Sequence, residues 1–182
     1  APRPNGQLSD DDFQGAFLEH LTRAVGGRMM SDVPLGAFLS GGLDSTAIVA
    51  LMSSQVDTAV STFSVGFGSR SFDESGQASE VAQVLGTRHH VEMQESLDLD
   101  DVGRILWHFG EPFGDSSAIP TYYLCKMARK RVTVALSGDG ADEVLAGYNR
   151  YVASQLAGRW SRLPVTLRGR RPLRWIAALP EG

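Results

Sequence analysis

The stretch SGGLDS, residues 40–45, combines the residue types of a phosphate-binding loop with one carboxylate. Gly41 and Gly42 permit positive φ and close backbone approach, and the successive amides after them can bind an anion. The lysine of the common nucleotide-triphosphate loop is missing from this stretch, and Asp44 would repel a bare phosphate. A divalent cation between them removes that conflict, because Mg²⁺ is commonly held by one or two carboxylates plus phosphate oxygens. The loop therefore predicts a metal–phosphate ligand and a second carboxylate elsewhere in the chain.

The stretch SGDGADE, residues 137–143, offers that second carboxylate. It carries three acids at spacings of three and four, and these are Asp139, Asp142 and Glu143. Residues so spaced share one face at the start of a helix. Acids at a helix N-terminus are also favoured by the helix dipole, so simple capping is the alternative interpretation. Two neighbouring glycines at the end of an apolar strand favour a ligand site over capping alone.

These two turns lie within an alternation of predicted strands and helices. Short apolar runs predict buried strands at residues 35–39, 62–67, 88–93 and 132–136. Helical patterns fall at residues 10–25, with Ser9 as the cap, and at 46–52, 72–85, 98–108, 122–129 and from 141 onward. We therefore predict an α/β fold, a three-layer sandwich in which helices cover both faces of a parallel sheet. Ligands of such sheets lie at the carboxyl ends of the strands, where both glycine-rich turns fall.

Composition and charge argue against several other classes of protein. No run approaches the ~20 apolar residues of a membrane span, and the N-terminal residues have no apolar signal core. We therefore predict a cytoplasmic protein with no membrane partner. The net charge is −4, but arginines gather after Tyr151. Such a basic tail can bind nucleic acid, yet no aromatic ladder accompanies it, so we prefer a solvated helix face and expect no nucleic-acid partner.

Two further groups of reactive side chains receive structural interpretations. Cys125 is the only cysteine, so no internal disulfide forms, and its helix-like surroundings indicate packing rather than nucleophilic catalysis. His89 and His90 are adjacent in a predicted strand, so their side chains should point to opposite faces and not chelate a metal together.

Several motifs together carry a resemblance to a known family. SGGLDS resembles the PP-loop signature of N-type ATP pyrophosphatases, which split ATP between its α and β phosphates. More specific is the wider set VPLGAFLSGGLDS, TFSVGF, FDES, LGTRHH and VALSGDGADEVLAGYNRY. From about Phe13 to Tyr151, the chain resembles the synthetase domain of glutamine-hydrolysing asparagine synthetases. The resemblance implies the adenine nucleotide α-hydrolase-like (PP-loop ATPase) fold, with ATP and Mg²⁺ as cofactors. It also implies adenylation of the aspartate side chain, release of pyrophosphate and amination by ammonia.

The same resemblance implies roles for individual residues. The pyrophosphate part of ATP would be bound by Ser40, Gly41, Gly42, Asp44 and Ser45. The rest of the nucleotide would be contacted by Leu39, Val65, Ser137 and Gly138. Mg²⁺ would be shared by Asp44 and Asp142. The catalytic residues would be Asp139, which would serve formation of the aspartyl-AMP intermediate, and Glu143, which would border the acyl-acceptor site. Ser116 and Ser117 would contact the acyl substrate.

Two departures from the family pattern keep the acyl acceptor open. The best-known members carry glutamate at the position of Asp139, and Ile119 stands near the place of an arginine that helps to hold aspartate. The alternatives are another PP-loop ligase, such as a β-lactam synthetase-like enzyme or an amidotransferase paralogue with a different acceptor, and a non-catalytic nucleotide-binding module.

The resemblance also implies a longer protein. Residues 1–12 are predicted to be a linker from an N-terminal glutaminase domain, and residues 13–182 to be part of the synthetase domain, with 152–182 a basic extension. In the family the glutaminase cysteine is the first residue of the mature chain, a role that Cys125 cannot take. We expect the isolated chain to lack glutaminase activity, to have little or no synthetase activity, and to need ammonia supplied from glutamine by that domain. A homodimer is compatible with the sequence.

Overall fold

The computed structural model describes residues 9–68, 74–94, 98–111 and 114–161. The chain divides into two compact units, Ala1–Gly138 and Asp139–Gly182, and each is described by itself.

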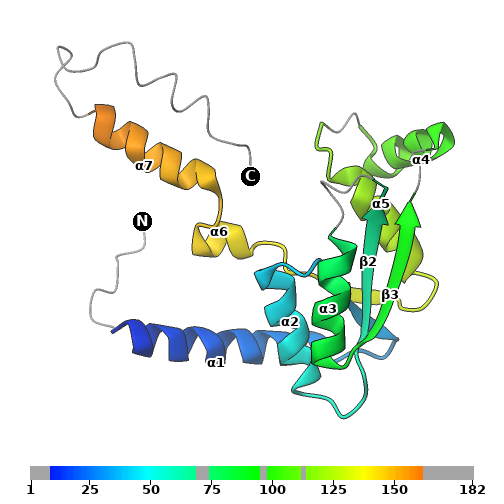
Figure 1. The fold of residues 1–182 in the computed structure, drawn as a ribbon, viewed down its shortest axis with the longest axis horizontal. Helices are drawn as coiled ribbons and strands as arrows, with labels where there is room; N and C mark the ends of the chain where they lie inside the picture. Colours follow the sequence, from blue (N-terminus) through cyan, green and yellow to red (C-terminus); the bar gives the residue numbers. More distant parts are fainter. Residues whose placement is uncertain (1–8, 69–73, 95–97, 112–113, 162–182) are drawn as a thin grey trace. The chain divides into compact units, whose positions relative to one another are not determined.

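The described residues of the first unit form a four-stranded parallel sheet in the order β3-β2-β1-β4. Figure 1 shows β2 and β3 side by side. The strands are β1 (Leu35–Phe38), β2 (Ser61–Phe67), β3 (Arg88–Gln94) and β4 (Val134–Leu136). The predicted parallel sheet is therefore confirmed. Because β2 and β4 flank β1 on opposite sides, the strand order reverses at β1, and such a switch point is where ligands bind in open α/β sheets.

The helices of this unit also follow the predicted pattern. They are α1 (Asp10–Met29), α2 (Leu43–Ser53), α3 (Ser75–Leu85), α4 (Leu99–Phe109) and α5 (Ala118–Ala128). Ser9 caps α1 as predicted, since its hydroxyl accepts a hydrogen bond of 3.2 Å from the Asp12 amide. Gly86 ends α3 in the left-handed conformation at φ 66°. The predicted start of this helix at residues 72 and 73 lies outside the described residues.

Several predicted boundaries were wrong. Helix α1 ends at Met29 rather than at residue 25, and α2 begins at Leu43 rather than at residue 46. β4 begins at Val134 rather than Val132, because the amide of Val132 still donates 2.9 Å to the Ala128 carbonyl that closes α5. Conversely, α5 begins at Ala118, before the predicted start at Tyr122. Pro120 lies in the first turn of this helix, where proline is tolerated.

Both faces of the sheet are covered by helices. Helices α1, α2 and α3 pack over one apolar cluster, which includes Ala37, Leu39, Val49, Met52 and Ala82. Helix α5 packs over the other, which contains Phe63, Met127, Ala128 and Val132. This arrangement confirms the three-layer α/β architecture. None of the described helices is both long and apolar enough to cross a membrane.

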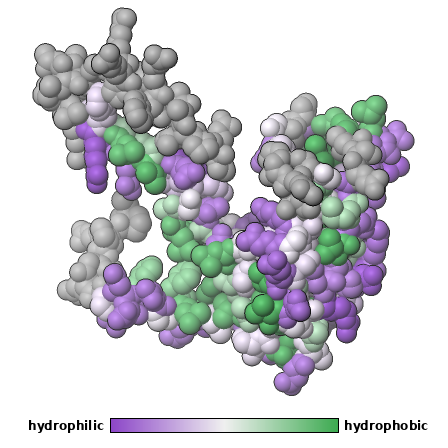
Figure 2. Space-filling model, in the orientation of Figure 1, coloured by the Kyte–Doolittle hydropathy of each residue, from purple (hydrophilic) through white to green (hydrophobic). Residues whose placement is uncertain are grey.

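Strand β3 stands at the edge of the described sheet and carries exposed charged side chains, and Figure 2 shows hydrophilic surface over much of this edge. Arg88 and Glu92 are exposed there, and Glu92 pairs with Lys130 at 3.0 Å. Charged side chains on an edge strand oppose further strand pairing.

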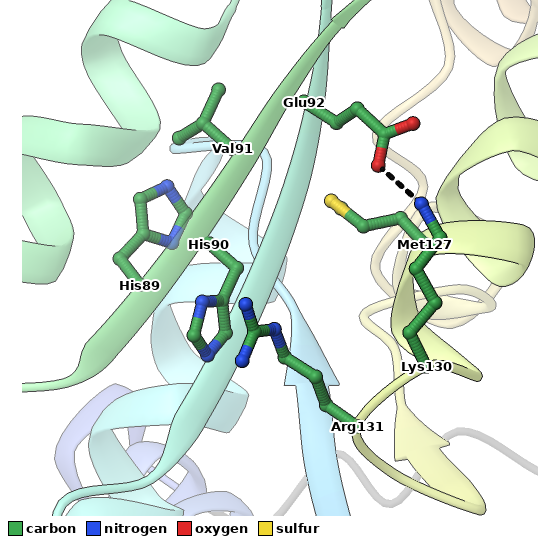
Figure 3. A pocket seen from close by; sticks show the side chains of 7 residues that line it. All are labelled: His89, His90, Val91, Glu92, Met127, Lys130 and Arg131. Carbon is green, nitrogen blue, oxygen red and sulfur yellow. Dashed lines mark hydrogen bonds and ion pairs between the residues drawn. The ribbon is translucent and has the colours of Figure 1, made fainter.

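His89 and His90 lie on opposite faces of β3, as predicted (Figure 3). His89 bridges β2, with its ring nitrogens 2.9 Å from the hydroxyls of Thr62 and Ser64. Burial lowers the pKa of His89 below its ordinary value, and the charge of His90 adds to that effect. His90 stacks on Phe63, with ring centroids 5.2 Å apart, and borders a pocket of about 350 Å³. Both histidines therefore have the structural roles that the sequence indicated.

The second unit contains α6 (Ala141–Leu145) and α7 (Asn149–Ser161). A helix from Ala141 was predicted, and it ends after five residues.

Candidate functional site

The turn between β1 and α2 is shaped by its own two serines. The Ser45 hydroxyl accepts a 3.2 Å hydrogen bond from the Ser40 amide and donates one of 3.2 Å to the Gly42 carbonyl. The Ser40 hydroxyl lies 3.0 Å from that of Ser45 and accepts from the Gly42 amide at 3.2 Å. Ser45 is only 8% exposed. Both hydroxyls thus hydrogen-bond within the turn and shape its backbone, and their contact with a phosphate stays a prediction.

The two glycines of this turn have different structural roles. Gly41 has φ 82°, and a Cβ there would lie 2.8 Å from the Ala78 amide nitrogen in α3. Gly42 is the N-cap of α2 and offers no side chain to the first-turn amides. Those amides are consequently left for an external acceptor, which a phosphate supplies well at a helix N-terminus. The contact with α3 was not predicted from the sequence, because it joins segments far apart in the chain.

The second glycine-rich turn begins against the first. β1 and β4 pair in register, with Ala37 opposite Leu136, so Ser137 and Gly138 follow at the same edge. A Cβ on Gly138 would lie 2.7 Å from the Ser45 amide nitrogen and 3.1 Å from the Asp44 Cβ. Only glycine allows this approach without a shift of backbone. The structure thus brings Gly138 together with Asp44 and Ser45, because β4 lies beside β1.

Leu39 and Val65 lie at this same carboxyl edge. The Leu39 amide donates 2.9 Å to the carbonyl of Phe63, two residues before Val65 on β2. The side chain of Leu39 is 1% exposed and belongs to the core. The whole residue is buried and its amide is already hydrogen-bonded, so contact of its backbone with a nucleotide stays a prediction.

Ser116 and Ser117 precede α5 and are exposed. The Ser117 amide donates 2.9 Å to a carboxylate oxygen of Asp115, and this hydrogen bond lowers the pKa of Asp115. The buried Asp101 of α4 ties the two helices together through Lys126 of α5, at 3.2 Å. The two serines thus lie exposed before the start of α5, whereas the ion pair is in its last turn, and their contact with a substrate stays a prediction.

The three acids of SGDGADE belong to the second unit. Gly140, at φ 92°, is the N-cap of α6, and Asp142 and Glu143 stand in the first turn of that helix. The Tyr148 hydroxyl donates 2.8 Å to Oε1 of Glu143, a contact that the sequence analysis missed although LAGYNRY was among its motifs. Because each unit is described by itself, the pairing of Asp44 with Asp142 and the role of Asp139 stay predictions.

The donor chemistry of the first turn fits Mg²⁺. Within the described ranges, no group of three or more His, Cys, Asp or Glu side chains converges to hold a metal ion. Asp44 contributes a half-buried carboxylate beside amides that suit a phosphate. Mg²⁺ is commonly bound by one or two carboxylates together with phosphate oxygens, so a full protein cage is not required.

Comparison with known proteins agrees with this geometry. Residues 16–180 match the asparagine synthase family. The chain belongs to that family. It is 38% identical over 177 residues to the glutamine-hydrolyzing asparagine synthetase 1 of Bacillus subtilis, covering 97% of this chain and 28% of that relative.

Two other relatives of this asparagine synthase family chain are matched over a similar share of their own length. A putative glutamine-hydrolyzing asparagine synthetase 2 of Methanocaldococcus jannaschii is 44% identical over 147 residues, covering 80% of this chain and 28% of the relative. A putative glutamine-hydrolyzing asparagine synthetase of Mycobacterium tuberculosis is 37% identical over 179 residues, covering 96% of this chain and 27% of the relative. The predicted family is confirmed, and the chain spans a little over a quarter of the length of these relatives.

Proposed function

We propose that the protein is an ATP-dependent ligase that forms an amide, of the glutamine-hydrolysing asparagine synthetase type. In this proposal the chain supplies the site where ATP is split. The observation that carries it is the first glycine-rich turn, which is braced by Ser45 at the sheet's switch point and packed against Gly138. Family membership supports ATP as the nucleotide.

In the proposed reaction the turn acts on the leaving pyrophosphate. An oxygen of the aspartate carboxylate attacks the α-phosphorus, and the bond from that phosphorus to the bridging oxygen breaks. The amides that follow Gly42 bind the released charge, and because the turn is already shaped they need no reorganisation. Asp44 and Asp142 would hold Mg²⁺, which neutralises phosphate charge when bound. Ammonia then attacks the acyl carbon, AMP leaves, and the nitrogen loses a proton to give the amide.

The remaining assignments belong to the same proposal. The relatives' names support glutamine as the source of ammonia, through a glutaminase domain that would precede the linker of residues 1–12. Residues 13–182 would be synthetase domain, with 152–182 its basic extension. A cytoplasmic location and a homodimer are further parts of the proposal.

A PP-loop ligase with a different acyl acceptor is the second candidate. It is favoured by Ile119, a partly buried apolar residue in the first turn of α5, where the family's best-known members hold aspartate with an arginine nearby. A carboxylate substrate would normally be met by an arginine fork. Exchange assays with a panel of amino acids and acyl-amino acids would separate the two candidates.

The decisive test is Asp44→Ala in the full-length protein. Exchange of pyrophosphate into ATP should fall by about a hundredfold or more, since the charge of the leaving group loses its counterion. Adenosine binding should not change, and the exposed Asp57→Ala should behave as wild type. Unchanged exchange in Asp44→Ala would overturn the metal assignment. Mg²⁺-dependent ATP binding without exchange for any acid would instead favour a non-catalytic module.

A further inference from the structure

The turn after α6 contains an unusual backbone conformation. Ala146 has φ 59°, in the left-handed region. Among the residues that the structure describes, no other non-glycine residue has a positive φ. This conformation is unfavourable for an alanine, because its Cβ then lies close to the following carbonyl oxygen. Residues held in such conformations cluster at functional sites, where the surrounding structure makes use of the strain. The two residues that follow this turn, Gly147 and Tyr148, contact the two acids of α6.

The backbone of Gly147 lies against Asp142. Its amide donates 3.0 Å to the Asp142 carbonyl, which closes α6. A Cβ placed on Gly147 would overlap Oδ1 of Asp142 and lie 3.0 Å from its Cγ. The side chain of Asp142 therefore rests directly on the glycine backbone, in space that any other residue would occupy.

Tyr148 contacts Glu143, the residue after Asp142. Its hydroxyl donates 2.8 Å to Oε1 of Glu143, and this bond raises the pKa of Tyr148 above its ordinary value. The guanidinium of Arg150 lies 4.0 Å from the centre of the Tyr148 ring, so the ring itself is held from its face. One carboxylate oxygen of Glu143 is thus fixed.

Neither a long helix nor a buried core restrains the side chains of α6 within the described residues of the second unit. Helix α6 has five residues, and a helix so short has little stability of its own. None of the described residues of α6 and α7 is buried, so no core immobilises the acids. Within the described residues of the second unit, the contacts on these two carboxylates come from this one turn.

We propose that Gly147 and Tyr148 are positioning residues, which set the orientation of Asp142 and Glu143 respectively for the reaction. This inference rests on the proposed function, since it gives the acids of α6 a role in catalysis. It extends the site to two residues of the turn after α6.

The first experiment compares two tyrosines of the same segment in the full-length protein. Tyr148→Phe should lower kcat for ammonia-dependent amide synthesis roughly tenfold, the expected loss for one hydrogen bond to a carboxylate, with KM for ATP unchanged. Tyr151→Phe is the matched control, because its ring packs beside that of Tyr148, with centroids 5.9 Å apart. Equal kcat values for the two variants would overturn the role of Tyr148.

The second experiment compares two glycines of the second unit. Gly147→Ala must displace the Asp142 side chain, whereas a Cβ on Gly158 meets nothing within 4 Å. Gly147→Ala should therefore reduce kcat and raise the Mg²⁺ concentration needed for half-maximal rate, and Gly158→Ala should do neither. A wild-type Mg²⁺ dependence in Gly147→Ala would overturn the role of Gly147.

A spectroscopic readout separates this inference from the proposed function. With ¹³C-labelled tyrosine, the pKa of Tyr148 should fall in Glu143→Gln, since the carboxylate that raises it is gone. An unchanged pKa would show that the hydrogen bond is not formed in solution. If Glu143→Gln retains full synthesis, the proposed role of Glu143 fails. If Glu143→Gln loses synthesis while Tyr148→Phe does not, only the positioning role fails.

Discussion

The two glycine-rich turns of this asparagine synthase family chain are held by different means. In SGGLDS the supporting groups are buried: Ser45 is 8% exposed and Leu39 is 1% exposed, and the turn joins a sheet strand to α2. In SGDGADE the acids Asp142 and Glu143 stand on a five-residue helix with no buried residue. Their side chains are restrained by a turn rather than by a core.

This difference corresponds to two kinds of ligand contact. A phosphate is bound by backbone amides, whose directions must be fixed together, and fixing a backbone requires packing and internal hydrogen bonds. A carboxylate that shares a cation is one side chain, and one or two contacts can orient it. The first turn should therefore lose both stability and nucleotide binding when altered, and the second should lose chiefly catalytic rate.

Among the changes that test this difference between the two turns, Gly41→Ala should cause the largest loss of stability and of ATP binding. The left-handed backbone alone costs roughly 1–2 kcal/mol, and the new Cβ would lie 2.8 Å from the Ala78 amide nitrogen, so α3 or the turn must move. We expect lower stability in urea denaturation and loss of ATP binding by calorimetry. Gly76→Ala, in the first turn of α3 with nothing within 4 Å, is the control. Retained ATP binding in Gly41→Ala would contradict the rigid phosphate cradle.

Ser45→Ala should have the next largest effect. It removes the acceptor of the Ser40 amide in a part-buried turn, and an unsatisfied buried group costs about 1–3 kcal/mol. Ser53→Ala on the same helix removes a buried hydroxyl that has no hydrogen-bond partner among the described residues, so it should be close to neutral. Similar urea midpoints for the two variants would show that the serine network does not brace the turn.

The smallest expected effect is a pH dependence confined to the first unit. Burial lowers the pKa of His89 in the folded state, so the unfolded chain binds more protons just below the ordinary histidine pKa of about 6.5. Stability should be fully present above that pH and should decline as the pH falls below it. His89→Gln should flatten the decline, as measured by urea midpoints across this range. An equal slope in wild type and variant would exclude His89 as its source.

Much of the fold could be predicted from local sequence signals. Ser9 and Gly86 marked helix ends because capping is decided by neighbouring residues. Continuous apolar strands indicated a parallel sheet because a strand buried on both faces has no polar side. The boundary that failed at Val134 depended on where α5 closes, because the Val132 amide still donates to the Ala128 carbonyl at the end of that helix.

The sequence by itself determined that SGGLDS suits an anion and that SGDGADE places its acids on one helical face. Only the tertiary structure decided that β4 lies beside β1, which sets Gly138 against Asp44 and Ser45. It also decided that Gly41 meets α3 and that Tyr148 reaches Glu143. The physical reason is that turn and helix chemistry acts over a few neighbouring residues, whereas strand order and close packing depend on the whole set of elements that share a core.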